Sequence, residues 1–207
     1  RPCVIVLLSL AVVVASCRRS SPGVESPQPA AVVRPDPAQF NGRAALDQVR
    51  RFLDMGPRDS GTPGAERAAK HILDELQRLG VRSEIDEFED DTPGGKRIFR
   101  NVLGRIGDQG MKTLILGSHY DTKSGIGGKF QGANDSGSST GLLLELASVL
   151  KKTPPPGVEV ILAFFDGEEC SVSYGRNDGL HGSRRLARSL VERGVSGRVL
   201  GVIVLDM

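Results

Sequence analysis

Three apolar segments of this chain each end in side chains that can bind a metal ion or transfer a proton. The segments and the residues that follow them are 112–118 with His119 and Asp121, 158–165 with Glu168 and Glu169, and 199–205 with Asp206. Carboxylates at the end of a buried segment are costly in free energy unless a cation or hydrogen-bond donors compensate them. A solvated acidic turn would explain one such segment, but a bound metal ion with a neighbouring carboxylate as base better explains all three.

A fourth candidate, Asp135, lies between the first two of these segments. It stands in the sequence Gly-Ala-Asn-Asp-Ser-Gly, which we expect to open a helix over residues 141–150. The carboxyl ends of parallel strands meet at one edge of a sheet, where ligands of open α/β folds bind. The sequence therefore predicts that Asp135 and the three strand ends converge on one metal-dependent site.

The elements that must position these residues follow from the hydrophobic pattern. Helices with an apolar face are expected first, then two strands, and then strands that alternate with helices. The predicted helices cover 43–55, 65–79, 141–150 and 183–192, and the predicted strands cover 81–88, 97–106, 112–118, 158–165 and 199–205. Residues 89–95 are expected to form a turn, and His71 lies off the apolar face of its helix, which predicts a solvated side chain. This order predicts an α/β fold, a three-layer sandwich with a mixed, mostly parallel central sheet flanked by helices.

The composition permits one sizeable domain and argues against some partners. The chain has 207 residues, 39% of them hydrophobic, with a net charge of +2 and no tryptophan. Because there is no long basic run and few aromatic side chains, we expect no nucleic-acid partner. Cys170 is expected to be a small buried residue rather than a catalytic thiol.

The first forty residues predict export and a membrane anchor. Residues 3–16 form an apolar run that is short for a membrane span and typical of a secretory signal. The run ends Val-Ala-Ser before Cys17, which resembles the acylation site of bacterial lipoproteins. We therefore expect a lipoprotein-type signal peptide over residues 1–17, a Ser/Pro-rich linker over 18–40 and a catalytic domain over 41–207. A lipid anchor on Cys17 would place the domain in the bacterial cell envelope, facing the periplasm or the exterior; a plain signal peptide would make it a secreted protein.

Four motifs give the domain a specific resemblance. GSHYDTK, GANDSGSSTGLLLELA, FFDGEE and VIVLDM resemble, in this order, the successive motifs of the M28 family of zinc peptidases. The resemblance extends from about residue 43 to residue 207 and implies a zinc aminopeptidase-like fold. It also implies a cis peptide bond between Asp135 and Ser136.

The resemblance implies a role for each residue at the strand ends. The ligands that it implies for two zinc ions are His119 and Asp206 on one ion, Glu169 on the other and Asp135 between the two. Glu168 would be the general base. Asp121 would orient His119 without touching a metal ion.

One segment is more similar to a particular branch of the family, the glutaminyl-peptide cyclotransferases (glutaminyl cyclases). Residues 170–187, CSVSYGRNDGLHGSRRLA, resemble the corresponding segment of those enzymes without gaps. Tyr174 stands where they carry a pocket tryptophan, and Lys123 fits them better than the aminopeptidases. His181 replaces a tyrosine and is interpreted as structural. The disulfide of the animal cyclases is absent because Ser118 and Thr140 stand in its place.

This closer resemblance implies a single zinc ion, bound by Asp135 and Glu169, and peptide or protein amino termini as substrates. Glu168 would take a proton from the α-amine of an amino-terminal glutamine and pass it to the departing ammonia. Asp206 would then be an acid in a hydrogen-bond relay. His119 and Asp206 would be ligands only if two zinc ions are bound.

Two alternatives stay open beside the cyclase. One is a two-zinc aminopeptidase that hydrolyses the amino-terminal peptide bond, and the other is a non-catalytic M28-like domain used for binding. Both enzymes of the family draw a further zinc ligand, a histidine, from a later part of the chain. We therefore expect this sequence to be a carboxyl-truncated fragment whose ligand set is incomplete.

Overall fold

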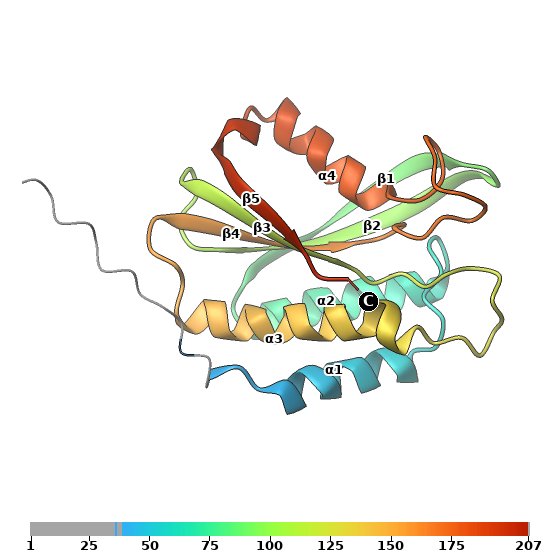
Figure 1. Ribbon diagram of the computed structural model, residues 1–207, viewed down its shortest axis with the longest axis horizontal. Coiled ribbons are helices and arrows are strands. Elements are labelled where there is room, and N and C mark those ends of the chain that lie inside the picture. The colour runs from blue at the N-terminus through green and yellow to red at the C-terminus, as the bar shows by residue number, and fades with distance from the viewer. Residues whose placement is uncertain (1–35, 37–38, 207) are drawn as a thin grey trace, which may run out of the picture. The chain divides into compact units, whose positions relative to one another are not determined.

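Figure 1 shows the computed structural model of the chain, which describes Asp36 and residues 39–206. The predicted signal peptide over residues 1–17 and nearly all of the predicted linker over 18–40 lie outside the described residues. The lipid anchor on Cys17 and the location in the cell envelope therefore stay predictions. In the described part of the chain, no helix is both long and apolar enough to cross a membrane.

The centre of the domain is a five-stranded mixed sheet with the strand order β1-β2-β4-β3-β5. The strands are β1 (Arg82–Thr92), β2 (Gly95–Ile106), β3 (Lys112–His119), β4 (Val158–Phe165) and β5 (Val199–Val204). Strand β3 runs parallel to both β4 and β5, whereas β2 is antiparallel to β1 and to β4. The three strands whose ends carry the candidate site residues are therefore the parallel ones.

Helices cover both faces of this sheet, as predicted. In Figure 1, α1 to α3 lie below the sheet and α4 lies above it. The helices are α1 (Gly42–Asp54), α2 (Pro63–Arg78), α3 (Ser139–Lys152) and α4 (His181–Glu192), with a short π-helical turn η2 (Ala133–Ser138) before α3 and a 3-10 turn η3 (Ser196–Arg198) before β5. The three-layer α/β architecture is confirmed.

Local sequence explains where the first two helices begin. The side chain of Asn41 accepts hydrogen bonds from the backbone N–H groups of Arg43 and Ala44, which would otherwise lack partners inside α1. The side chain of Thr62 caps α2 in the same way, and Pro63 occupies the first helical position, where its missing N–H costs nothing.

Strand β4 is buried on both faces, as its continuous apolar sequence predicts. Leu162 and Phe164 join the main core under α2 and α3. Ile161, Ala163 and Phe165 point to the other face and form a second, smaller core with Leu186 of α4. The acidic turn that follows β4 is thus attached to the most deeply buried strand of the sheet.

The first strand is longer than predicted, because residues 89–92 belong to β1 rather than to a turn. Asp90 pairs with Arg97 and Asp91 with Lys96 across the hairpin. In addition, Nζ of Lys96 lies 2.7 Å from a carboxylate oxygen of Glu89. Opposite charges on facing strands extend the ladder through a segment whose polar composition alone favours a turn.

Two further predictions were wrong. The side chain of His71 is half-buried rather than solvated: its ring packs edge-on against Phe52 at a centroid distance of 5.4 Å, and its Nε2 lies 3.1 Å from Gln48. Strand β5 was predicted to be buried, but within the described residues it pairs only with β3 and forms an edge of the sheet. As a result, side chains such as Val202 and Ile203 are more than half exposed.

Candidate metal and catalytic centre

The register of the parallel strands brings the predicted site residues to one edge of the sheet. His119 of β3 is directly opposite Phe165, the last residue of β4. Gly117 of β3 is opposite Val204, the last residue of β5. Because β3 and β4 end at the same level and β5 ends two residues earlier, His119, the turn after β4 and Asp206 can lie side by side.

Three of the predicted residues form a close group. Nε2 of His119 lies 2.9 Å from Oδ1 of Asp135 and 3.5 Å from Oδ1 of Asp206. One nitrogen and two carboxylate oxygens therefore lie within 4.8 Å of one another. This is a set of donor atoms that zinc and similar divalent ions accept.

The chemistry of this group fits a metal ion. Oδ1 of Asp135 is buried and has no hydrogen-bond partner, although it faces Nε2 of His119. The other ring nitrogen of His119, Nδ1, lies 3.3 Å from Asp121, where the imidazole donates because a carboxylate only accepts. A neutral His119 would then present a lone pair to the carboxylate of Asp135, an arrangement that a cation between them would stabilise.

Asp121 is placed as the resemblance implied, behind His119. This buried carboxylate accepts hydrogen bonds from the backbone N–H groups of Glu168 at 3.1 Å and of Glu169 at 3.2 Å. It thereby links the acidic turn after β4 to the end of β3. The same side chain both orients the imidazole of His119 and positions the two glutamates.

The surroundings of His119 favour its protonated form when no metal is bound. Burial lowers its pKa, but the hydrogen bond and charge of Asp121, together with the charges of Glu168 and Asp135, outweigh burial and raise the pKa to about 9. A metal ion must therefore displace a proton from this histidine at neutral pH.

Glu168, the predicted base, is half-buried beside this group. Burial raises its pKa and the charges of Asp121 and Asp206 act in the same direction, whereas the charge of His119 and the hydrogen bond from the Tyr174 hydroxyl lower it. The hydroxyl of Tyr174 donates to Glu168 at 3.2 Å and 3.4 Å from its two oxygens. A carboxylate with a raised pKa that one hydroxyl orients has the properties of a general base.

Glu169 and Lys123 lie next to each other, outside the group of three donor atoms around His119. Nζ of Lys123 is 3.5 Å from a carboxylate oxygen of Glu169. Burial and the charge of Asp135 raise the pKa of Glu169, so its carboxylate is close enough to Asp135 for the two to interact. Lys123 also lies 5.9 Å from the ring centroid of Tyr174 and donates a hydrogen bond to the carbonyl oxygen of Cys170.

The segment between Glu169 and α4 is held in a defined shape by Asp178. Its carboxylate accepts hydrogen bonds from the backbone N–H groups of Ser171, Val172 and Ser173. Although the segment has almost no regular structure, these bonds fix the loop that carries Tyr174. Tyr174 itself is 56% exposed and is therefore accessible to a substrate.

The remaining candidates in this segment are structural. Cys170 is buried, as predicted. His181 is stacked on Phe99 at a centroid distance of 4.3 Å, and its Nδ1 lies 2.9 Å from Asp90. His181 is thus engaged in packing and a hydrogen bond, in agreement with the structural interpretation.

Two expectations about the neighbourhood of Asp135 also hold. The peptide bond between Asp135 and Ser136 is cis. At the position of the absent disulfide, Oγ of Ser118 lies 3.5 Å from Oγ1 of Thr140. Thr140 in turn donates to the carbonyl oxygen of His119 at 2.8 Å, so hydroxyl groups join α3 to β3 where animal cyclases use a covalent bond.

Arg58 is a residue that sequence analysis missed. Its side chain is fully buried, and it donates to the carbonyl oxygens of Tyr120 at 2.8 Å, Gln131 at 2.8 Å and Gly132 at 3.0 Å. Burial lowers its pKa to about 10, against the charges of Asp121 and Asp59. Arg58 therefore joins the end of β3 to the loop that presents Asp135.

Ser60 and Asp166 form a second feature that was missed. Oγ of Ser60 donates to Asp166 at 2.7 Å and lies 3.3 Å from Asp121. Burial and the charge of Asp121 raise the pKa of Asp166 to about 7, although hydrogen bonds from Ser60 and from the backbone of Arg100 lower it. The hydroxyl of Ser60 thus lies between two buried carboxyl groups directly behind the candidate site.

Comparisons with known proteins agree with this geometry. The sequence model of Peptidase family M28 matches residues 101–207. A glutaminyl-peptide cyclotransferase from Drosophila melanogaster is 32% identical over 170 residues, which are 80% of this chain and 47% of that protein. The crystal structure of a glutaminyl cyclase from an Acidobacteriales bacterium superposes with a TM-score of 0.76 at 34% identity, covering 87% of this chain and 63% of that one.

A second kind of enzyme shares the fold. The crystal structure of a Zn-dependent exopeptidase from Parabacteroides distasonis gives a TM-score of 0.69 at 26% identity, covering 81% of this chain and 62% of that one. The chain spans about half the length of the curated relatives that it matches.

The first prediction concerns the competition between metal and proton at His119. Below a pH of about 9 this histidine holds a proton, so the apparent affinity for Zn²⁺ should rise about tenfold per pH unit between about pH 6 and about pH 9 and then level off. Competition with a chromophoric chelator for Zn²⁺ would measure this affinity at each pH. In Asp121→Asn the Zn²⁺ affinity should stop rising at a lower pH, because the pKa of His119 is lower without the charge of Asp121. A Zn²⁺ affinity that does not depend on pH would contradict the assignment of His119 as a ligand.

The second prediction concerns Arg58. Replacement by Lys keeps the charge but cannot serve all the carbonyl groups, so the free energy of unfolding should fall by about 2–4 kcal/mol. Zn²⁺ affinity should fall as well, because the loop of Asp135 loses its anchor. The matched control is Arg67→Lys, an exposed arginine with one 3.4 Å hydrogen bond to a carbonyl oxygen. Urea unfolding and Zn²⁺ titration would test both, and equal effects of the two substitutions would contradict the anchoring role.

Proposed function

Because this chain belongs to peptidase family M28, we propose that it acts on peptide amino termini as a zinc-dependent glutaminyl-peptide cyclotransferase. It would convert an amino-terminal glutamine to a pyroglutamyl group with release of ammonia. The observation that carries the proposal is the loop over residues 170–181, in which Asp178 fixes the backbone and Tyr174 donates to Glu168. The names of the relatives from Drosophila melanogaster and the Acidobacteriales bacterium support the same activity.

The residues present would hold the metal ion that this chemistry requires. In the cyclase, Asp135 and Glu169 would be its ligands from this part of the chain. A bound zinc ion would polarise the γ-carboxamide oxygen of the substrate glutamine and make its carbon more electrophilic. The buried Oδ1 of Asp135, which faces Nε2 of His119 at 2.9 Å, is consistent with such a ligand role.

Glu168 would move the proton in the proposed reaction. The α-amine of the substrate must lose a proton for its nitrogen to bond to the γ-carbon, and ammonia must gain a proton as the carbon–nitrogen bond of the amide breaks. One carboxylate that accepts the first proton and returns it to the leaving group satisfies both requirements. Burial raises the pKa of Glu168, which makes its carboxylate a stronger acceptor for the first proton. Asp206, whose charge acts on Glu168, would take part in a hydrogen-bond relay beside it.

A second function, the two-zinc aminopeptidase, is favoured by a different observation. The donor atoms that form the close group belong to His119, Asp135 and Asp206. The M28 resemblance assigns His119 and Asp206 to one zinc ion and Asp135 to the bridge between two zinc ions. Water would then be the nucleophile and Glu168 its base. The similarity to a Zn-dependent exopeptidase supports this alternative. A non-catalytic binding domain is disfavoured, since a binding role would not need Glu168 in this setting.

The third prediction separates these functions. The full-length gene product, loaded with Zn²⁺, is incubated with two matched peptides, one beginning with Gln and one with Leu, and both are followed by mass spectrometry. The cyclase predicts loss of one ammonia from the Gln peptide only, with activity reduced at least about a thousandfold in Glu168→Gln. Removal of a whole amino-terminal residue would instead support the aminopeptidase, and no change in either peptide with zinc bound would support the binding domain.

The fourth prediction concerns the hydroxyl of Tyr174. Because this hydrogen bond lowers the pKa of Glu168, Tyr174→Phe should raise that pKa and move the acidic limb of kcat/KM to higher pH. The maximal kcat should fall by about fivefold, as expected for one lost hydrogen bond. Tyr174→Trp, which introduces the residue that the cyclases carry at this position, is the matched control for the aromatic surface. An unchanged pH profile in Tyr174→Phe would show that the hydroxyl does not act on the base.

A further inference from the structure

A cavity of about 590 Å³ lies on the α4 face of the sheet, away from the candidate catalytic centre. Its lining includes Thr113 and Glu159, the second residues of β3 and β4, whereas the catalytic residues follow the last residues of the same strands. Six residues of extended chain separate Thr113 from His119, a distance of about 20 Å. The cavity and the catalytic centre are therefore different sites.

Charge in the cavity is predominantly positive. Four arginines and two glutamates line it, a formal excess of two positive charges: Arg82, Arg105, Arg193 and Arg198 against Glu84 and Glu159. Strands, the end of α4 and the turn before β5 all contribute, so residues distant in sequence build one basic cavity. A concentration of guanidinium groups is characteristic of sites that bind carboxylate or phosphate.

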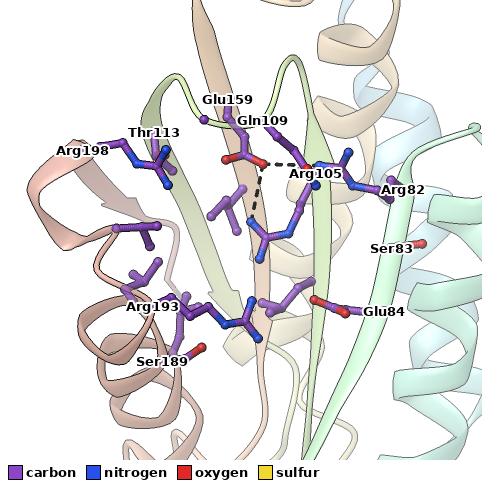
Figure 2. A pocket seen from close by; sticks show the side chains of 16 residues that line it. Arg82, Ser83, Glu84, Arg105, Gln109, Thr113, Glu159, Ser189, Arg193 and Arg198 are labelled. Atoms are coloured by element: carbon purple, nitrogen blue, oxygen red, sulfur yellow. Dashed lines mark hydrogen bonds and ion pairs between the residues drawn. The ribbon is translucent and has the colours of Figure 1, made fainter.

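Part of this charge is already neutralised inside the protein. The buried carboxylate of Glu159 lies 3.3 Å from a guanidinium nitrogen of Arg82 and 3.6 Å from one of Arg105. Figure 2 marks both contacts at the upper part of the cavity. One carboxylate shared by two arginines leaves a positive charge uncompensated.

Arg193 and Arg198 add charge that no acid neutralises. Within the described residues, neither guanidinium has a carboxylate within 4.0 Å. Figure 2 shows the side chains of Arg193, from the end of α4, and Arg105, from β2, both directed toward the middle of the cavity. Like charges turned toward one space repel each other unless an anion lies between them.

Part of the cavity wall is apolar. Leu190 and Val195 line it and are partly exposed, next to the buried Leu103, Ile161 and Leu186 of the smaller core. A ligand that only carried charge would leave Leu190 and Val195 in contact with water. An organic anion would cover this apolar wall and also neutralise the arginines.

We propose that this cavity binds a small organic phosphate. Its phosphate group contacts Arg105, Arg193 and Arg198, and its apolar part lies against Leu190 and Val195. A phosphate monoester carries about 1.5 to 2 negative charges at neutral pH, which matches the excess charge of the lining. Binding here is independent of the metal and of the proposed cyclase activity.

The experiment uses the full-length protein and three probes. The probe 1-naphthyl phosphate carries both the charge and the apolar body, 1-naphthol only the apolar body, and inorganic phosphate only the charge. We expect saturable binding of 1-naphthyl phosphate by isothermal titration calorimetry, at least tenfold tighter than that of either other probe. Added EDTA should leave the affinity unchanged, because no metal takes part, whereas it would abolish the proposed enzyme activity.

Two variants test the assignment of the residues. The double variant Arg193→Ala/Arg198→Ala should weaken binding of 1-naphthyl phosphate at least tenfold, and both positions are accessible enough to solvent for the fold to persist. The matched control is Arg188→Ala, an exposed arginine of α4 that does not line the cavity, which should bind as the unmodified protein does. Absence of saturable binding, an equal loss in Arg188→Ala, or loss of binding with EDTA would overturn the proposal.

Discussion

The buried carboxylate of Asp121 is the group on which the geometry of the candidate site depends. It is only 1% exposed, and a charge so placed is costly unless donors surround it. The backbone N–H groups of Glu168 and Glu169 and the imidazole of His119 supply those donors. Satisfying one buried charge therefore joins the end of β3 to the turn after β4, and Ser60 of the loop before α2, which donates to Asp166, lies 3.3 Å from the same carboxylate.

The same edge of the sheet holds more negative charge than its cations can compensate. The carboxyl groups are those of Asp121, Asp135, Asp166, Glu168, Glu169 and Asp206. Arg58 is nearby, but its donors are bound to backbone carbonyl groups, and Lys123 is shared between Glu169 and Cys170. The remaining compensation is a proton on His119 and on Asp166, or a metal ion. The raised pKa values of His119 and Asp166 reflect this protonation. A divalent ion would compensate the negative charge of the carboxylates more strongly than these protons do.

The sequence predicted the elements and the site residues correctly wherever a local pattern of residues determines the structure. A continuous apolar run identified β4, and the rule that parallel strands end at one edge was enough to bring His119, Asp135 and Asp206 together. The position of β5 depends on strand order, which no local pattern encodes, so its apolar sequence predicted a buried strand where the structure has an edge strand. Arg58 and Ser60 lie in a Gly/Pro-rich loop without periodicity. The partners described for them are 61 to 106 residues away in the chain, the most distant being Asp166 for Ser60, and only the fold brings them into contact.

The M28 donor set does not by itself determine the chemistry, because Glu168 can serve either an amine or a water molecule as base. What differs is the surface that holds the substrate beside it. In this chain the segment after Glu169 is long, and its backbone is fixed by the carboxylate of Asp178 rather than by regular structure. It presents an exposed aromatic ring whose hydroxyl contacts the base. A side chain that contacts the base and also faces solvent can contact a substrate that is bound beside Glu168. In the proposed cyclase that substrate would be an amino-terminal glutamine, whose intramolecular attack requires its amine to be held close to its own γ-carbon.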